Sequence, residues 1–549
     1  MSVIPALDSV ARRSSLSRLR GEAFDVVIIG GGITGAGIAR AAALKGFRVA
    51  LLEAADFAEG TSSRSTKLIH GGLRYLAMGE VGLVRETALE RKAVHAMAPH
   101  LARPRWLLVP ASSRIGQLKY RIGITVYERL GAVARSEVHR NLDRDSLLAY
   151  EPLLDREAYP YGCIYREYLT DDSRLVLASL RAAVAAGAVA VNYLRVESLV
   201  WQGDTVVGVQ ARCALGGETL EVRGRLVVNA TGPWVEEVLK LEQPDAPQRL
   251  HLSKGIHVVL PYARLPIRHM LLLEARDGRP IFVIPRDRVV YVGTTDTSHE
   301  RGAQLWPRVE RDEVSYVLEP VSRYLDVDPV TPEECVGAWA GLRPLIAQPG
   351  KASRDISRKD EVWQGTGGML SIAGGKLTGF RKMADDVLEL IESKLGRPSE
   401  NRNGESQNNG SQTTLMPLPG GDFDGDLASL AHDLRAQVNL DQASAVRLAR
   451  LYGDESRELI RGDVTPLVPG ARILRCEVDW SVRYEGAQRV EDFIYRRAGA
   501  AFYDPADKDA LLEPTSQRMK TLLGWSEEQR RDEEEAARRR LREDLAFQK

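Results

Sequence analysis

The segment from Phe24 to Glu53 constrains the fold more than any other part of the 549-residue chain. Its sequence, FDVVIIGGGITGAGIARAAALKGFRVALLE, contains two apolar runs, Val26–Ile29 and Val49–Leu52, which predict buried parallel strands. A Gly-x-Gly-x-x-Gly turn lies between them, and the residues from Gly37 to about Leu44 predict a helix. A strand, a glycine turn, a helix and a second strand that ends in an acid form the order that a dinucleotide-binding unit requires.

Each glycine of this turn has a physical role in such a unit. Gly30 allows the tight turn, Gly32 lets the backbone approach a pyrophosphate, and Gly35 lets the helix pack closely. The N–H groups and the dipole at the start of the helix attract the anion. Glu53, at the end of the second strand, is placed to accept a hydrogen bond from a ribose hydroxyl. The turn alone does not decide which dinucleotide is bound.

Composition excludes several other classes of protein. The formal net charge is zero, which argues against a nucleic-acid protein that depends on a large basic excess. No apolar run reaches the roughly 20 residues of a membrane-spanning helix. The four cysteines are scattered, without a CxxC pair, so neither a metal site nor a disulfide is expected. We expect a cytoplasmic protein, with a membrane surface as a further location.

Residues 1–21 form a basic leader without the apolar region of a secretory signal. We expect this leader to be disordered, and a helix lying on anionic lipid is the alternative.

Further along the chain, helices are expected at Val84–Ala98 and Arg174–Ala186, and a mainly helical region at about Leu107–Tyr150. The short apolar runs between His251 and Thr295, broken by prolines, predict an antiparallel sheet. Residues 401–414 read NRNGESQNNGSQTT, which is typical of a flexible linker. The patterns beyond this linker are helical.

Several motifs together resemble one family. They read SSRSTKLIHGGLRYL from Ser62, VNATGPWV from Val228, KGIHVVLP from Lys254, GLRPL from Gly341 and GGKLTGFRKMA from Gly374. This set is similar to the FAD-dependent glycerol-3-phosphate dehydrogenases, from about residue 22 to 396 and more loosely through residues 482–497. The resemblance implies FAD rather than NAD as the cofactor. The chain departs from the family's usual GGKLTTYR at Gly379 and Phe380. Phe380 lacks the hydroxyl that could donate a further hydrogen bond at this position.

The resemblance implies an α/β fold in which a Rossmann-like FAD-binding domain is interleaved with an antiparallel-sheet substrate domain. The FAD-binding part is expected at about residues 22–100, 170–240 and 346–400, and the substrate-binding part at about 101–169 and 241–345. Residues 401–416 are expected as a linker, and residues 417–549 as a C-terminal helical domain. The residues expected to contact FAD are Gly30, Gly32, Ile33, Thr34, Gly35, Glu53, Ala54, Thr61, Ser62, Lys67, Leu68, His70, Gly71, Gly72, Ala230, Gly232, Trp234, Gly375, Lys376, Leu377 and Thr378.

The implied substrate is an alcohol that carries a phosphate, which needs cations and a base. Arginine suits phosphate oxygens through its planar fork, and lysine supplies a point charge. The resemblance implies that Arg74, Arg343 and Lys376 line the substrate pocket beside Tyr75. Arg354 is a further candidate, although a surface salt bridge explains it equally well.

A histidine near its ordinary pKa is the natural base for the hydroxyl proton. Taken alone, a histidine at the entry to an apolar strand is more often structural, but the resemblance favours His257 for this role, so the implied catalytic set is His257, Arg343 and Lys376. His70, in the KLIHGG stretch, is expected to contact the flavin instead.

The resemblance implies oxidation of sn-glycerol 3-phosphate to dihydroxyacetone phosphate by hydride transfer to FAD, with a quinone as the next acceptor. It also implies a peripheral place on the inner face of the cytoplasmic membrane. A homodimer is compatible with the chain. The alternatives are an oxidase that delivers electrons to oxygen, an amine or amino-acid oxidase of the same plan, and a non-catalytic dinucleotide-binding protein. The short linker, in place of a long insertion, favours the dehydrogenase over the oxidase.

Overall fold

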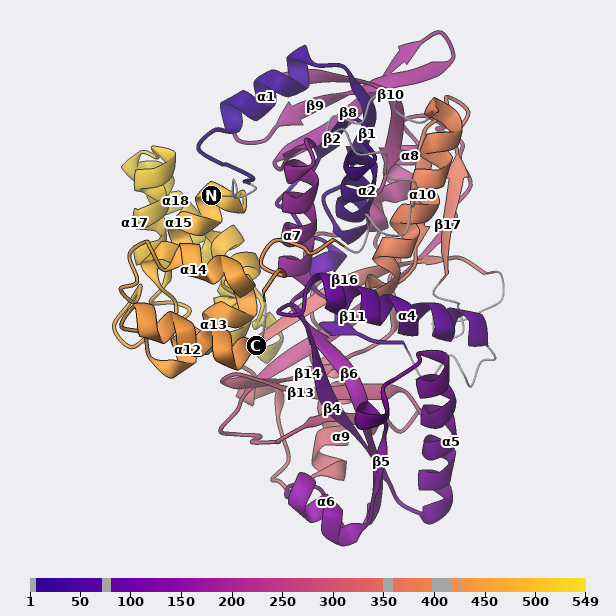
Figure 1. Ribbon diagram of the computed structural model, residues 1–549, viewed down its shortest axis with the longest axis vertical. Helices are drawn as coiled ribbons and strands as arrows, with labels where there is room; N and C mark the ends of the chain where they lie inside the picture. The colour runs from indigo at the N-terminus through magenta and orange to yellow at the C-terminus, as the bar shows by residue number, and fades with distance from the viewer. Residues whose placement is uncertain (1–5, 72–79, 349–358, 397–415, 424–425) are drawn as a thin grey trace.

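A computed structural model describes residues 6–71, 80–348, 359–396, 416–423 and 426–549. The candidates Gly72, Arg74, Tyr75 and Arg354 lie outside these described residues, as does nearly all of the expected linker. Two sheets and a group of C-terminal helices make up the molecule (Figure 1).

The first sheet contains the two strands predicted around the glycine turn, β1 and β2. Its central strands run in the order β18–β10–β1–β2–β7 and are parallel, and every residue of β2 is buried. Continuous apolar runs such as that of β1 are typical of parallel strands covered on both faces. The strands of this sheet are β1 (Phe24–Ile29), β2 (Val49–Leu52), β7 (Val189–Val191), β8 (Leu194–Gln202), β9 (Thr205–Cys213), β10 (Thr219–Asn229), β17 (Asp360–Gln364) and β18 (Leu370–Gly374).

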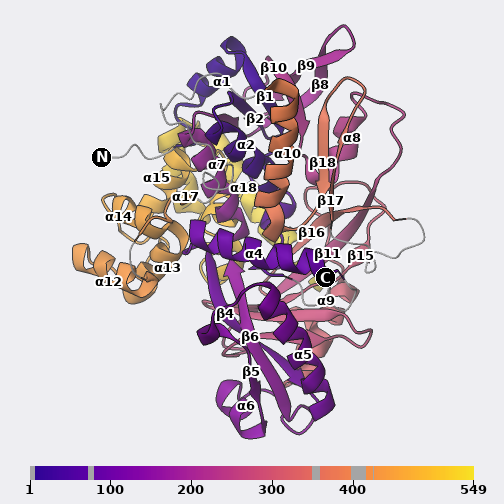
Figure 2. The same cartoon turned by 45° about the vertical axis from the view of Figure 1, so that its right-hand side comes forward.

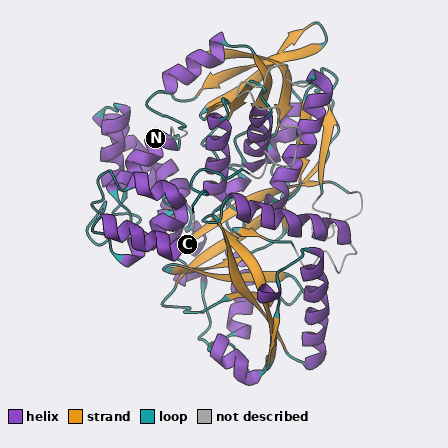
Figure 3. Ribbon diagram, in the orientation of Figure 1, coloured by secondary structure: helices purple, strands orange, loops and turns teal. Residues whose placement is uncertain are grey.

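Helices α2 (Ile33–Leu44), α7 (Asp172–Ala185) and α10 (Phe380–Leu395) pack together beside this sheet (Figure 3). Helix α2 begins at Ile33, four residues before the predicted start. The close packing expected at Gly35 is confirmed, because a Cβ atom there would lie 1.9 Å from the carbonyl oxygen of Gly30. Phe380, the departure from the family pattern, is buried in the core against Gly37 of α2.

The basic leader is not disordered where the structure describes it. Residues Arg12–Gly21 form helix α1, whose Leu16 and Leu19 are buried in the core beneath the first sheet. The Arg12 guanidinium donates hydrogen bonds to the side-chain and backbone oxygens of Asn192. Apolar side chains at helical spacing, masked in the sequence by the arginines, explain the difference.

The second sheet is largely antiparallel, as expected from the proline-broken runs. Its order is β15–β11–β14–β13–β12–β4–β6–β3, with β16 paired to β11 and β5 paired to β6. The helical prediction for residues 107–150 is wrong at its start, where β4 pairs along its whole length with β6. The strands are β3 (Leu68–Ile69), β4 (Ala102–Ala111), β5 (Arg140–Leu142), β6 (Tyr161–Thr170), β11 (Leu250–Pro261), β12 (Met270–Glu274), β13 (Pro280–Arg286), β14 (Val289–Gly293), β15 (Thr297–Ser298) and β16 (Gly337–Ile346).

The two sheets draw on alternating stretches of the chain, so the chain passes between them several times; the exact domain boundaries stay a prediction. The helices connected with the second sheet are α4 (Val81–Met97), α5 (Arg114–Leu130), α6 (Arg144–Tyr150) and α9 (Arg311–Tyr324), and α8 (Val235–Leu239) follows β10. No helix within the described ranges is long and apolar enough to cross a bilayer.

The C-terminal residues form a helical domain on one side of the molecule (Figures 1 and 2). Buried ion pairs join it to the first sheet: Asp56, just after β2, accepts hydrogen bonds from Arg496 and Arg497, and all three side chains are almost fully buried. Its helices are α12 (Leu427–Gln437), α13 (Gln442–Tyr452), α14 (Ser456–Leu459), α15 (Arg475–Tyr484), α16 (Ala500–Tyr503), α17 (Leu512–Leu523) and α18 (Glu527–Glu543).

Candidate active site

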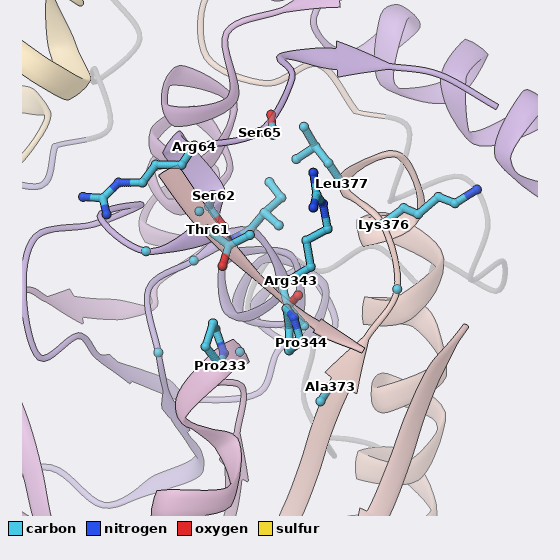
Figure 4. A pocket seen from close by; sticks show the side chains of 18 of the residues that line it. Thr61, Ser62, Arg64, Ser65, Pro233, Arg343, Pro344, Ala373, Lys376 and Leu377 are labelled. Atoms are coloured by element: carbon cyan, nitrogen blue, oxygen red, sulfur yellow. Dashed lines mark hydrogen bonds between the residues drawn. The ribbon is translucent and has the colours of Figure 1, made fainter. Parts of the chain in front are cut away.

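Residues from both sheets and from the turns between them line a cavity of about 790 Å³. This volume lies within the range of pockets that bind small molecules and cofactors. The glycine turn after β1, the segment 59–66 and the segment 230–234 supply part of its wall. Residues 341–345 of β16 and 372–378 supply another part (Figure 4). Segments that are more than three hundred residues apart in sequence therefore meet in one site.

The glycine turn is shaped to approach a pyrophosphate. Gly30 adopts a φ of +111°, and a Cβ atom there would lie 2.6 Å from the carbonyl oxygen of Ala230. The N–H of Ile33, in the first turn of α2, donates a 3.0 Å hydrogen bond to Ser62 Oγ. Both Ile33 and Ser62 line the cavity, so the start of α2 faces it. A helix start in this position favours a bound anion.

Glu53 lies at the carboxyl end of β2 and lines the cavity. Its carboxylate accepts hydrogen bonds from the backbone N–H groups of Gly31, at 2.6 Å, and of Ala55, at 2.8 Å. Burial raises the pKa of Glu53 to about 7, although these two bonds act against the shift. The carboxylate oxygens have further lone pairs for ribose hydroxyls, so the predicted role is compatible with the geometry.

Most residues predicted to contact the cofactor line the cavity. They are Gly30, Gly32, Ile33, Thr34, Glu53, Ala54, Thr61, Ser62, Leu68, His70, Ala230, Gly232, Trp234, Gly375, Lys376, Leu377 and Thr378.

Three predicted contacts within the described part of the chain do not line it. Gly35 lies beneath the turn, against the backbone of Gly30. The Lys67 ammonium is buried and donates to Asp172 Oδ1, at 2.7 Å, and to the carbonyl oxygen of Ser63, at 2.8 Å. Gly71 packs against the ring of Tyr127. These three residues therefore pack behind the cavity wall and do not form part of it.

Arg343, on β16, lines the cavity with a side chain that is about one quarter exposed. Its guanidinium donates to the carbonyl oxygen of Thr295, at 3.1 Å, and to Thr294 Oγ1, at 2.9 Å, and one nitrogen lies 3.8 Å from Asp296 Oδ1. A Cβ atom on Gly255 would lie 2.2 Å from the same guanidinium, so the glycine on the neighbouring strand makes room for it. The arginine is thus oriented before any ligand enters.

Lys376 lines the cavity through the segment that precedes a short 3₁₀ turn at Leu377–Gly379. Its side chain extends away from Arg343 in the close view of the cavity (Figure 4). Burial raises the pKa of Glu86, on α4, and of Glu167, on β6, and the charge of Lys376 acts against both shifts, so its ammonium lies near these two acids. The structure therefore does not bring the two predicted cations together.

The two candidate histidines occupy different positions. His257 is 1% exposed and is absent from the cavity lining: its ring stacks on Trp339, with centroids 4.9 Å apart, and its Nε2 lies 3.0 Å from Thr66 Oγ1. Burial, together with Arg343 and Lys67, lowers the pKa of His257 well below its ordinary value. His70 lines the cavity, and its ring contacts the edge of the Phe282 ring. Of the two histidines, His70 therefore lines the cavity and His257 does not, and the identity of the base stays a prediction.

Sequence reasoning missed several charged or aromatic residues of the cavity wall, namely Arg64, Tyr165, Glu167 and Arg279. Arg64 lies in the SSRSTK stretch and packs its guanidinium 3.6 Å from the centre of the Trp306 ring. Tyr165 and Glu167 belong to β6, a strand that was not predicted. The aromatic and apolar residues of YGCIYREYLT, from Tyr161 to Thr170, are the signal that favours a strand here, whereas no alternation marks which side chains face the cavity.

Comparison with known proteins agrees with this site. The family model for the FAD dependent oxidoreductases matches residues 25–381, and that for the C-terminal domain of alpha-glycerophosphate oxidase matches residues 411–530. An aerobic glycerol-3-phosphate dehydrogenase of Staphylococcus aureus (strain COL) is 37% identical over 92% of this chain and 93% of its own length.

Two solved structures are similar as well. A glycerol-3-phosphate dehydrogenase from Bacillus halodurans, complexed with FAD, is 31% identical with a TM-score of 0.80, covering 98% of this chain and 99% of that one. An L-alpha-glycerophosphate oxidase from Mycoplasma pneumoniae with FAD bound is 16% identical with a TM-score of 0.54, covering 69% and 97%, and supports the fold alone. The glycine cradle, the Glu53 carboxylate and the cavity volume fit FAD. The chain belongs to the family of FAD-dependent glycerol-3-phosphate dehydrogenases.

Proposed function

We propose that this protein oxidises sn-glycerol 3-phosphate to dihydroxyacetone phosphate and passes the electrons to a quinone. The observation that carries the substrate assignment is Arg343, whose oriented guanidinium lies in the same cavity as the Gly30 turn and Glu53. The names of the relatives support the same substrate.

The reaction breaks two bonds at the secondary alcohol. The carbon loses its hydrogen with the electron pair, and the hydroxyl loses its proton. FAD, when bound, supplies the acceptor for the hydride. The residues of the chain must therefore hold the phosphate dianion, place the alcohol carbon and receive the proton. They must do so in one cavity because proximity and orientation supply much of the rate acceleration in such reactions.

Arg343 holds the phosphate in this proposal. Its planar fork matches two phosphate oxygens, and Thr294 and Thr295 fix the plane of the fork. Charge-assisted hydrogen bonds of this kind contribute roughly 1.5–3 kcal/mol each. We propose Arg74, Tyr75 and Arg354 as further phosphate contacts from segments outside the described residues.

His70 receives the hydroxyl proton in this proposal, in place of His257. A base must come within hydrogen-bond distance of the proton that it removes. His70 lines the cavity, whereas His257 is absent from the lining and contacts Thr66, which belongs to it. We assign Lys376 an electrostatic role, because its backbone forms the cavity wall beside Leu377 and its ammonium lies near the acids of α4 and β6.

A substrate titration tests this assignment. In the FAD-loaded protein under anaerobic conditions, glycerol 3-phosphate should bleach the flavin. Arg343→Met should raise the dissociation constant about 10–100-fold, since it removes the charge-assisted bonds to phosphate. Arg276→Met, which removes an exposed arginine paired with Glu319, is the matched control and should leave binding unchanged. Equal binding by both variants would refute the role of Arg343.

The quinone acceptor is supported by one exposed surface. Helix α5 projects at the edge of the molecule, away from the C-terminal helices (Figures 1 and 2). Its outer face carries Ile115, Leu118, Ile122 and Val126, which are 70%, 50%, 57% and 40% exposed. Their spacing of three and four residues places them on one side of the helix. We name these four residues the α5 ridge.

The charges around the α5 ridge complement an anionic membrane. Arg114, Lys119, Arg121 and Arg129 belong to the same helix, and its single acid, Glu128, is buried against His139. A helix with an exposed apolar face and basic flanks lies in the interface of a lipid bilayer. A membrane contact suits an acceptor that is dissolved in lipid, so we propose the inner face of the cytoplasmic membrane as the location.

Rapid mixing separates the quinone from oxygen. After anaerobic reduction by glycerol 3-phosphate, a ubiquinone analogue should reoxidise the flavin faster than air-saturated buffer does. Rapid reoxidation by oxygen with formation of peroxide would instead make the protein a glycerol-3-phosphate oxidase.

A further inference from the structure

The backbone of His70 and Gly71 is surrounded by side chains from separate elements. Thr378 Oγ1 accepts the N–H of His70 at 3.1 Å and donates to the carbonyl oxygen of the same residue at 3.0 Å. Thr87 Oγ1, on α4, lies 3.1 Å from the carbonyl oxygen of Gly71, and the Tyr127 hydroxyl, on α5, accepts its N–H at 3.2 Å. All four polar groups of this backbone therefore lie within hydrogen-bond distance of a side chain.

Of these side chains, Tyr127 packs most closely against the backbone of Gly71. A Cβ atom on residue 71 would lie 2.3 Å from Tyr127 Cε2, so a glycine at this position lets the ring lie against the backbone. The hydroxyl accepts from the N–H of Gly71 and from Arg91, the latter at 2.6 Å, and lies 3.1 Å from Glu167 Oε1. One donor and two acceptors are all that a hydroxyl provides, so this one is fully used.

Glu167 connects Tyr127 with the cavity. Its other oxygen accepts from Arg91 at 3.0 Å, and the side chains of Arg91, Tyr127 and Glu167 are almost fully buried. The register of β3 with β6 pairs Leu68 with Leu169 and Ile69 with Tyr168. His70 and Glu167 each come one residue beyond the last of these pairs, and both line the cavity.

We propose that Arg91, Tyr127 and Glu167, here named the cavity triad, position His70 to receive the proton of the substrate hydroxyl. This inference rests on the proposed function, because it needs His70 as the base. Arg91 holds the Glu167 carboxylate, Glu167 orients the Tyr127 hydroxyl, and the hydroxyl fixes the backbone beside the imidazole. The triad acts through His70 and is a set of positioning residues.

Several charged or titratable groups face Glu167 from the elements around it. They are Arg91 from α4, Tyr127 from α5, Tyr165 and Tyr168 from its own strand and Lys376 from the segment before the 3₁₀ turn.

The C-terminal helices provide a matched control. Arg447 donates to both oxygens of Glu477, at 2.7 and 2.6 Å, and the Tyr452 hydroxyl lies 3.0 Å from the same carboxylate. We name these three buried residues the C-terminal triad. Tyr452→Phe removes the same kind of hydroxyl–carboxylate bond as Tyr127→Phe, but at a position that does not line the cavity.

The test compares Tyr127→Phe with Tyr452→Phe in the FAD-loaded full chain. Hydrogen–deuterium exchange is measured for a peptide that contains His70 and Gly71, and flavin reduction by saturating glycerol 3-phosphate is followed across pH. Tyr127→Phe should speed exchange at Gly71 about tenfold, because the amide loses its acceptor. It should also slow reduction about tenfold and shift the midpoint of its pH profile. Tyr452→Phe should change none of these, although both should lower the unfolding temperature. Glu167→Gln serves as the second cavity variant if Tyr127→Phe does not fold.

Each remaining outcome is decisive. Equal exchange in the two variants, or faster exchange without slower reduction, would overturn the positioning role. A wild-type protein that glycerol 3-phosphate does not reduce would overturn the proposed function instead. In that case, exchange at Gly71 would still decide whether the triad holds this backbone.

Discussion

Two buried triads of the same residue types stand in different parts of this molecule. Arg91, Tyr127 and Glu167 form one beside the cavity, and Arg447, Tyr452 and Glu477 form the other among the C-terminal helices. In both, an arginine pairs with a carboxylate, and a tyrosine hydroxyl lies within hydrogen-bond distance of it. Such clusters satisfy buried charge because each group has a partner.

The triads differ in what they hold. Glu477 accepts the N–H of Leu474 at the start of α15, and Arg447 donates to the carbonyl oxygen of Ala498, so this triad joins helices of one domain. In the cavity triad, Tyr127 accepts the N–H of Gly71, next to His70. The same three residue types therefore stabilise helix packing in the C-terminal domain and, in the cavity triad, the backbone beside His70. The contact with Gly71 is what distinguishes the cavity triad.

The largest predicted effect concerns His70, which lies beside the cavity triad and has no counterpart in the C-terminal triad. His70→Gln should lower the rate of flavin reduction by about 10²–10⁴-fold, since a general base contributes about that much. His257→Gln is the matched variant; it should retain most of the rate, because His257 does not line the cavity. Stopped-flow reduction of both FAD-loaded variants measures this. The reverse order of effects would restore His257 as the base.

The second prediction removes the cation from each triad. Arg91→Met and Arg447→Met each leave a buried carboxylate without its arginine, which should lower the free energy of unfolding by about 3–5 kcal/mol. Denaturant unfolding of the two variants should give similar losses. Only Arg91→Met should also slow flavin reduction in the protein that remains folded. Slower reduction in both would mean that general destabilisation, not the contact with His70, controls the rate.

The first sheet and the cofactor turn are predictable from sequence, whereas the two triads are not. Val26–Ile29, the glycines and Glu53 are close together in sequence and follow a pattern with a local physical cause. Glu167 was missed because β6 was not recognised as a strand. The position of His257 outside the cavity lining could not be foreseen, because β11 is buried along most of its length and alternation of apolar and polar residues does not tell which face a histidine occupies. Facing directions in a strand covered on both sides depend on tertiary packing.

The carboxylate of Glu53 sharpens the comparison, because backbone N–H groups, rather than an arginine, donate hydrogen bonds to it. The pKa of Glu53 is raised to about 7 by burial. A raised pKa means that the folded protein binds a proton there more tightly than the unfolded chain does. Its contribution to stability is therefore present at low pH and is lost as the pH rises toward 7.

Ribose hydroxyls favour the ionised form of Glu53. The dissociation constant of FAD should therefore fall as the pH rises toward about 7, and should level off above it. Glu53→Gln should remove this pH dependence and weaken FAD binding about 10–100-fold, through the loss of charge-assisted bonds. Fluorescence titration of the apoprotein with FAD between pH 5.5 and 8.5 measures both effects. A flat pH profile in the wild-type protein would contradict the role of Glu53.

The smallest effect on catalysis is expected on the outer side of α5, opposite the face that carries Tyr127. Leu118→Glu combined with Ile122→Glu should abolish co-sedimentation with vesicles containing phosphatidylglycerol and leave flavin reduction in solution unchanged. Leu390→Glu, an exposed leucine on α10, is the control and should still bind. Equal binding of vesicles by the α5 double variant and by Leu390→Glu would exclude the α5 ridge as the membrane contact.

Anaerobic addition of glycerol 3-phosphate to the purified FAD-loaded protein tests the central claim most directly. The account predicts that the yellow flavin absorbance bleaches, that dihydroxyacetone phosphate forms in equal amount, and that glycine or proline has no such effect. A flavin that stays oxidised with glycerol 3-phosphate, or that amino acids reduce instead, would contradict the account.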